Sequence, residues 1–296
     1  MQPSGQKPRP PGVEMKPEVE VKMIEWFDSR FYKIKYQKED VEICDYFASV
    51  TTKLGIISKP FLAHWRGSVG NREADLRSFE ASERGVRIHS AWYSLTTGGA
   101  VLYNPFQNPN YSKEEIEKLQ EEYLGNVSVV QYQDEMYDVF KLKRWLEIVK
   151  PKIILSEKTV YSLKNKDAGT LDNLMEIEEG KYLVSGKEPI HIPGGIYVVD
   201  LKSGKEVDEN ANMQTACYAD CVEEMEIAKI EGTLILHTGS KVRNGIEGLS
   251  TILRNKDEMR QDYSDYRLAS ALWERKNADA RPRVFEFPSL LTMKEK

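Results

Sequence analysis

The sequence predicts an α/β (α+β) fold, in which helices flank a mixed central β-sheet and the N-terminal part is helical. Residues 42–150 have mostly helical spacing, whereas the pattern from residue 152 onward is that of successive short strands. A strand, a helix and a further strand then follow. An antiparallel run of strands followed by a strand–helix–strand unit predicts a sheet with helices on both faces.

The first residues differ in composition from the rest of the chain. Residues 1–22 are rich in Pro, Lys and Glu and contain no apolar segment of the kind a secretory signal requires. We expect them to form a disordered lead-in. Residues 23–36 mix aromatic and charged side chains and read as a strand or hairpin. Without an internal repeat or a clear linker, residues 23–296 are predicted to form a single domain.

The helical part is defined by apolar spacing and by its end signals. Residues 45–98 read as mostly helical, and Gly98-Gly99 ends a helix whose apolar face carries Val86, Ile88, Ala91, Trp92 and Leu95. Ser112 is the expected N-cap of the next helix, which Gly125 stops. The helical spacing of residues 138–150 ends at Pro151.

The sheet core is expected over about residues 151–240. Strands are predicted at residues 152–163, 168–178, 181–185 and 194–204, separated by polar or Gly-containing turns. A helix at 211–227 and a strand at 231–239 come next. A long polar helix over residues 254–276 completes the order.

Composition limits the classes of function. A net charge of -5 and a pI near 5.6 argue against a protein that coats nucleic acid with its whole surface, although an enzyme with one local basic cleft remains compatible. Three cysteines, in no zinc or iron–sulfur spacing, predict a reducing, cytoplasmic compartment. No apolar stretch approaches the roughly 20 residues of a membrane-spanning helix.

Two strand ends carry the side chains of greatest chemical interest. Asp200 and Lys202 lie two apart in one strand, so their side chains emerge on the same face. They could form a plain ion pair. Asp172 follows small and apolar residues in a neighbouring strand, so the two carboxylates could come close together. A divalent cation would remove their mutual repulsion.

Further polar residues could complete such a site. A lone histidine such as His89 is more often an ordinary half-buried residue than a metal ligand. Gln214 and Tyr218 lie four apart on the helix after Lys202, so both polar ends point the same way. Amphipathic packing accounts for Tyr218 but not for Gln214.

Four motifs in order carry a family resemblance: GVRIH at 85–89, AGTLD at 168–172, VVDLKSGK at 198–205 and QTACY at 214–218. Together they resemble the RecB-type branch of the PD-(D/E)XK nuclease superfamily, which includes phage exonucleases and the mitochondrial genome maintenance exonuclease. The resemblance extends over roughly residues 31–227, including a Ser-Val-Thr-Thr stretch at 49–52. It implies a restriction-endonuclease-like core.

The resemblance implies a role for each matching residue. His89, Asp172 and Asp200 would hold Mg²⁺ or Mn²⁺, with the backbone carbonyl of Leu201 as a further ligand. Lys202 would position or activate the attacking water. Gln214 and Tyr218 would support the site and the DNA strand. Glu157 would contact the residues that bind the metal without binding it directly.

Two kinds of cofactor are not expected. The cysteine spacing lacks the four-cysteine pattern of the iron–sulfur subgroup. Gly204-Lys205 is followed by Glu206 where a nucleotide-binding loop needs Ser or Thr.

The expected function is a metal-dependent deoxyribonuclease, by resemblance an exonuclease rather than an endonuclease, that processes DNA ends in replication, recombination or repair. Expected partners are single-stranded DNA or DNA ends and replication or recombination proteins, in a phage-encoded, bacterial or archaeal setting. The alternatives are an endonuclease, a non-catalytic DNA-binding scaffold of the same fold, and a hydrolase of another phosphate ester. Basic residues with aromatic residues nearby could form the DNA surface: 141–145, Lys158, Lys164, Lys166, Lys241, Arg243 and 253–256, with Trp92, Tyr132, Tyr137 and Tyr161. The alternative, which is favoured for any single residue, is that the charges lie on solvated helix faces and the aromatic residues in the core.

Overall fold

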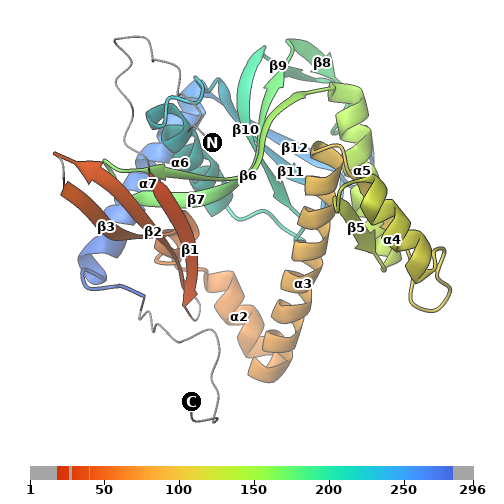
Figure 1. The fold of residues 1–296 in the computed structure, drawn as a ribbon, viewed down its shortest axis with the longest axis horizontal. Coiled ribbons are helices and arrows are strands. Elements are labelled where there is room, and N and C mark those ends of the chain that lie inside the picture. Colours follow the sequence, from red (N-terminus) through yellow and green to blue (C-terminus); the bar gives the residue numbers. More distant parts are fainter. Residues whose placement is uncertain (1–18, 27–28, 40, 283–296) are drawn as a thin grey trace, which may run out of the picture.

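A five-stranded mixed sheet forms the centre of the protein (Figure 1). The computed structural model describes residues 19–26, 29–39 and 41–282. The strand order is β12-β11-β10-β7-β6, in which β10 and β11 are parallel and all other neighbours are antiparallel. The strands are β6 (Lys152–Ser162), β7 (Asp167–Ile177), β10 (Gly195–Lys202), β11 (Gly232–His237) and β12 (Ser250–Asn255). The predicted mixed α/β fold is therefore confirmed.

Helices cover both faces of this sheet, and each face has its own apolar core. On one face, α3 (Asn71–Thr96) and α5 (Gln133–Val149) contribute Trp92 and Trp145 to a cluster with sheet residues such as Val199. The other face is covered by α1 (Val50–Leu54), α6 (Asn210–Glu224) and α7 (Lys256–Lys276). Val198 packs there beside α6, so neighbouring β10 residues alternate between the two cores as a pleated strand requires.

A three-stranded antiparallel sheet precedes the helices. It consists of β1 (Glu20–Trp26), β2 (Ser29–Lys38) and β3 (Val41–Ala48). The strand or hairpin predicted at 23–36 is part of the hairpin of β1 and β2. Residues 42–48 belong to β3, so the helical part begins at Val50 rather than at 42. Residues 20–22, expected in the lead-in, belong to β1, and residues 1–18 lie outside the described chain.

The small sheet is fixed to the central one near the start of β7. Tyr32 and Ile34 of β2 are fully buried in a cluster with Ala168 of β7. The Tyr32 hydroxyl lies 3.0 Å from the Thr170 hydroxyl, a distance at which either can donate. The small sheet therefore contacts β7 directly before Asp172.

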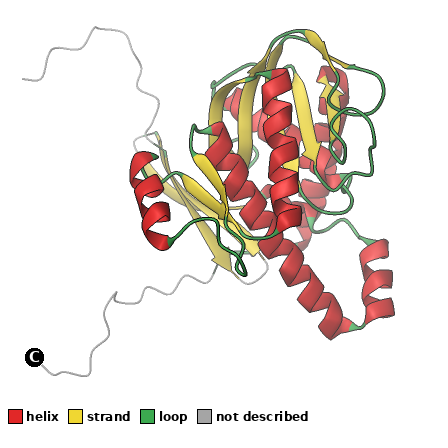
Figure 2. Cartoon of the chain, turned by 90° about the vertical axis from the view of Figure 1, so that its right-hand side faces the viewer, coloured by secondary structure: helices red, strands yellow, loops and turns green. Residues whose placement is uncertain are grey.

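A helical arm and two small strand pairs extend this frame. In Figures 1 and 2, α2 (Pro60–Val69) and the first half of α3 extend away from the central sheet. The pairs are β4 (Ala100–Tyr103) with β5 (Val127–Val130), and β8 (Gly180–Tyr182) with β9 (Ile190–Ile192). The strands β4, β5, β9 and β12 have no counterpart in the sequence prediction.

Two of the predicted helix ends have the expected local chemistry. Ser112 caps α4 (Lys113–Glu122) through a capping box with Glu115. The C-cap of α5, Lys150, has a left-handed backbone, and Pro151 then prevents a further turn. In the described residues, no helix has the length and apolar character needed to cross a membrane.

Candidate metal centre

The candidate site lies where β7 and β10 separate. The last paired residues of these strands are Val199 and Asn173, and Asp172 comes next on β7. Its Oδ2 accepts the Leu201 N–H at 2.7 Å, which replaces the missing ladder bond. The N–H and C=O of one strand residue point toward the same neighbouring strand. The Leu201 carbonyl, the backbone ligand implied by the resemblance, therefore also points toward β7.

Three side chains from three elements converge at this separation. His89 of α3, Glu157 of β6 and Asp172 of β7 each offer a ligand atom, and these atoms lie within 4.8 Å of one another. His89 Nδ1 is 3.5 Å from Asp172 Oδ1. One imidazole nitrogen and two carboxylates form a donor set that could hold Mg²⁺ or Mn²⁺.

Glu157 reaches this group through an irregular stretch of β6. Ser156 pairs with Asn173 and Lys158 with Leu171, so Glu157 lies opposite Asp172. Its φ is +47°, a left-handed conformation that costs about 1–3 kcal/mol for a residue other than glycine. The outlier is located at the residues that offer metal ligands, where such strain is commonly found.

The opposite strand is irregular at the same level. Leu171 and Leu174 both pack into the cluster beneath α6, although residues three apart in a regular strand face opposite sides. The alternation of β7 side chains between the two faces of the sheet is therefore shifted by one residue around Asp172. The sequence motif gives no sign of either irregularity.

The electrostatics of this group favour a cation. Burial alone would lower the pKa of His89, but the negative charge of Asp172 raises it to about 9. Burial, reinforced by the charge of Asp172, raises the pKa of Glu157 to about 7. A divalent ion would relieve the repulsion between the two carboxylates, which is the physical basis for expecting one here.

The other predicted residues form a second polar group on the α6 side of the sheet. Lys202 Nζ lies 2.7 Å from Asp200 Oδ2 and donates to Gln214 Oε1 at 3.2 Å. The Gln214 amide donates to the Tyr218 hydroxyl at 3.2 Å and to Asp200 Oδ1 at 3.5 Å. These contacts account for Gln214, whose presence on the helix amphipathic packing does not explain.

Asp200 differs from the ligands implied by the resemblance in one respect. The close three-residue group contains Glu157, whereas Asp200 is engaged by Lys202. The Asp200 side chain is 3% exposed, and within the described chain its Oδ2 accepts no hydrogen bond of good geometry. Burial, together with the charge of Asp172, raises its pKa despite the neighbouring Lys202. Because Lys202 Nζ already lies 2.7 Å from this oxygen, Asp200 is paired with a protein cation, and the grouped ligand atoms come from His89, Glu157 and Asp172.

Gly169 explains how Tyr218 comes to lie against β7. A Cβ at Gly169 would be 2.3 Å from Tyr218 Cε1, far closer than carbon atoms approach. The missing side chain therefore leaves the space that the aromatic ring fills. Because the Tyr218 hydroxyl accepts from Gln214, this glycine indirectly positions the partners of Asp200 and Lys202.

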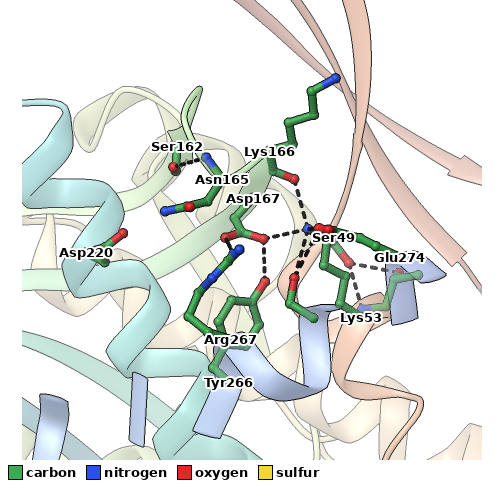
Figure 3. Close-up of polar contacts among 12 residues, drawn as sticks. Ser49, Lys53, Ser162, Asn165, Lys166, Asp167, Asp220, Tyr266, Arg267 and Glu274 are labelled. Carbon is green, nitrogen blue, oxygen red and sulfur yellow. Dashed lines mark hydrogen bonds and ion pairs between the residues drawn. The ribbon is translucent and has the colours of Figure 1, made fainter. Parts of the chain in front are cut away.

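A second charged cluster, shown in Figure 3, has a different character. Lys53 Nζ donates to Asp167 Oδ1 at 2.6 Å and to Glu274 Oε1 at 2.7 Å. The hydroxyl of Tyr266 and the guanidinium of Arg267 also donate to Asp167. Protein donors reach both oxygens of Asp167, and these contacts join α1, β7 and α7.

The aromatic residues expected near DNA fall into two groups. Trp92 and Trp145 are almost completely buried in the core between α3, α5 and the sheet, so neither can stack on a base. Tyr132 and Tyr137 are 47% and 59% exposed. Of the two alternatives for these residues, the two tryptophans therefore follow the core alternative, as their helical spacing allows.

Comparison with known proteins adds no family assignment, because no family model and no curated protein matches the chain.

Proposed function

We propose that this protein is a Mg²⁺- or Mn²⁺-dependent nuclease that hydrolyses phosphodiester bonds in DNA. The observation that carries the proposal is the group of His89, Glu157 and Asp172, together with the buried Asp200–Lys202 pair on the next strand. Oxygen ligands, one imidazole and a lysine are the components that metal-assisted phosphate hydrolysis needs. The resemblance of the four ordered motifs favours DNA as the substrate.

The residues divide the chemical work between them. His89, Glu157, Asp172 and the Leu201 carbonyl would hold a metal ion, which supplies an acidified water and a Lewis acid for the phosphoryl oxygens. The positively charged ammonium group of Lys202 lies beside Asp200. There it can donate a hydrogen bond to a phosphate oxygen or to the attacking water.

The α6 residues act on this lysine. Gln214 accepts a hydrogen bond from Lys202 and donates to Tyr218, which restricts the lysine to one orientation. An oriented cation stabilises developing negative charge better than a mobile one because little reorganisation is left to occur.

An exonuclease acting on DNA ends is the form of this activity that we favour, on the strength of the motif resemblance. Replication, recombination or repair are the processes that such an enzyme would serve, alongside the proteins that generate DNA ends. A DNA-binding scaffold of the same fold would lack any need for the intact set of ligands and lysine.

A time course on end-labelled linear DNA, beside a covalently closed circle, tests the proposal. Reactions contain Mg²⁺, Mn²⁺ or EDTA, and the variants are Lys202→Ala and Lys205→Ala. Lys205 is an exposed lysine three residues away and serves as the matched control. We expect metal-dependent shortening of the linear DNA alone, lost in Lys202→Ala and retained in Lys205→Ala.

Other outcomes would lead to different conclusions. Cleavage of the closed circle would identify an endonuclease. Binding of DNA without cleavage under any condition would favour the scaffold. Asp200→Ala should also abolish cleavage while DNA binding persists, and full activity in that variant would refute the site.

A further inference from the structure

A fully buried asparagine lies next to the candidate metal centre. Asn173 directly follows Asp172 on β7, and its side chain is inaccessible to solvent. Its Oδ1 accepts a hydrogen bond from the Trp92 indole N–H. Its Nδ2 donates to Ser156 Oγ at 2.7 Å and to Thr96 Oγ1 at 3.3 Å. One planar amide is thus bonded to two neighbouring elements.

These partners belong to the elements that carry the three candidate ligands. Trp92 lies three residues, nearly one helical turn, after His89 on α3. Ser156 immediately precedes Glu157 on β6. The amide itself is attached to β7 next to Asp172. The three bonds therefore connect α3, β6 and β7, the elements that carry the candidate ligands.

We infer that Asn173 is a positioning residue for the metal centre, a role that rests on the proposed function. It sets the separation between His89, Glu157 and Asp172 by fixing their three elements to one another. A rigid amide suits this role because its donor and acceptor directions are fixed in one plane. In a buried, low-dielectric site such bonds are strong and specify one arrangement.

The strained backbone of Glu157 requires hydrogen bonds that hold the neighbouring part of β6 in place. A left-handed residue within a strand persists only where its surroundings hold it there. Ser156 is bonded to Asn173 and also lies 3.2 Å from the Thr96 hydroxyl, so β6 is held from two sides immediately before the strained residue. Without these bonds the strand could relax and move the Glu157 carboxylate away from the other ligands.

A purely structural role would have a different signature. If the amide only stabilises the core, its loss lowers the unfolding temperature. Metal affinity then changes by no more than it does in another core variant of the same stability. If the amide positions ligands, metal affinity falls well beyond the change produced by an equally destabilising substitution elsewhere. Outer hydrogen bonds to metal ligands typically change affinity or activity about 10–100-fold.

The experiment compares Asn173→Leu with Leu142→Ala, a core substitution on α5, an element that carries no candidate ligand. Mn²⁺ binding is measured by isothermal titration calorimetry, and unfolding temperature by circular dichroism in EDTA. We expect Mn²⁺ affinity to fall about 10–100-fold in Asn173→Leu and to change less than about twofold in Leu142→Ala. If Asn173→Leu does not fold, Thr96→Val and Ser156→Ala each remove one connection and should weaken binding separately.

The failures of the two proposals are distinguishable. A wild-type protein that binds no Mn²⁺ would overturn the proposed metal-dependent function and this inference with it. A wild type that binds Mn²⁺, with Asn173→Leu or both milder variants binding equally well, would overturn the inference and leave the proposed function intact.

Discussion

Removing the charge of Lys53 should destabilise the protein strongly although Lys53 is not part of the candidate site. In Lys53→Met the side chain keeps its apolar stem and loses the ammonium group. The Lys53 and Asp167 side chains are 2% and 1% exposed, so water cannot replace the lost contact. Breaking one partner of such a buried pair costs about 3–5 kcal/mol.

The remaining contacts place the expected cost within that range. Asp167 would still accept from the Tyr266 hydroxyl and from Arg267, so its charge is not fully stranded. Glu274 is 45% exposed and can turn toward water. We therefore expect Lys53→Met to cost about 3 kcal/mol, the lower end of the range.

Asp167→Leu should cost more, about 4–5 kcal/mol, because it leaves the buried ammonium of Lys53 with Glu274 as its only carboxylate among the described residues. The double variant, Lys53→Met with Asp167→Leu, removes both charges, so neither is left buried without its partner. Its loss in free energy of unfolding should therefore be at least about 1 kcal/mol below the sum of the losses in the single variants.

Urea unfolding followed by circular dichroism measures these free energies, and the slope with denaturant checks that the unfolded states are comparable. Costs that add within about 0.5 kcal/mol would mean that the two groups do not interact. A cost below about 1 kcal/mol for Lys53→Met would equally refute the reasoning, because it would be the value of an exposed pair.

Three further predictions concern the site and its surroundings. Gly169→Ala would push a methyl group into the Tyr218 ring. Under the proposed function, this variant should slow DNA cleavage at least about tenfold through Gln214 and Lys202. Gly67→Ala, where a Cβ meets nothing within 4 Å, should leave the rate unchanged. Equal rates in both variants would contradict this. Mn²⁺ at about 100 times its dissociation constant should stabilise the wild type by about 2.7 kcal/mol, reversibly with EDTA, and should not stabilise Asp172→Asn, as thermal unfolding can test. Burial would raise the pKa of Asp45, but hydrogen bonds from Lys166 and the Tyr46 N–H hold it below its ordinary value. The stabilisation is therefore present above the ordinary pKa and is lost as pH falls through the lowered one. Lys166→Met should cost at most about 1 kcal/mol at pH 7, and its difference from wild type in urea unfolding should shrink as the pH falls below the ordinary Asp pKa of about 3.9.

The fold was largely predictable where local signals agree with tertiary packing. The Ser112 cap, Pro151 and the alternating strands of residues 152–202 all gave correct elements. Residues 42–48 were wrongly predicted to be helical. They belong to β3, which forms by pairing with β2 and whose short sequence has no strong periodicity of its own. The strand β12 directly precedes α7, so its residues were partly absorbed into the predicted helix.

The candidate site was predictable in its members more than in its arrangement. Spacing correctly indicated that Asp200 and Lys202 share a face and that Gln214 and Tyr218 point together. The place of Glu157 depends on a left-handed backbone that no residue pattern in β6 signals. Asn173 offered one signal, a polar residue within an apolar strand, but its partners come from elements distant in sequence.

The left-handed backbone of Glu157 means that folding and function compete at one position. Glycine adopts a φ of +47° without steric cost, so Glu157→Gly should make the metal-free protein more stable. It would also remove a carboxylate that faces the charge of Asp172. A screen for thermal stability would therefore select the loss of this side chain, and with it the loss of a candidate metal ligand. Stabilising the protein by sequence design should accordingly exclude residue 157 from variation.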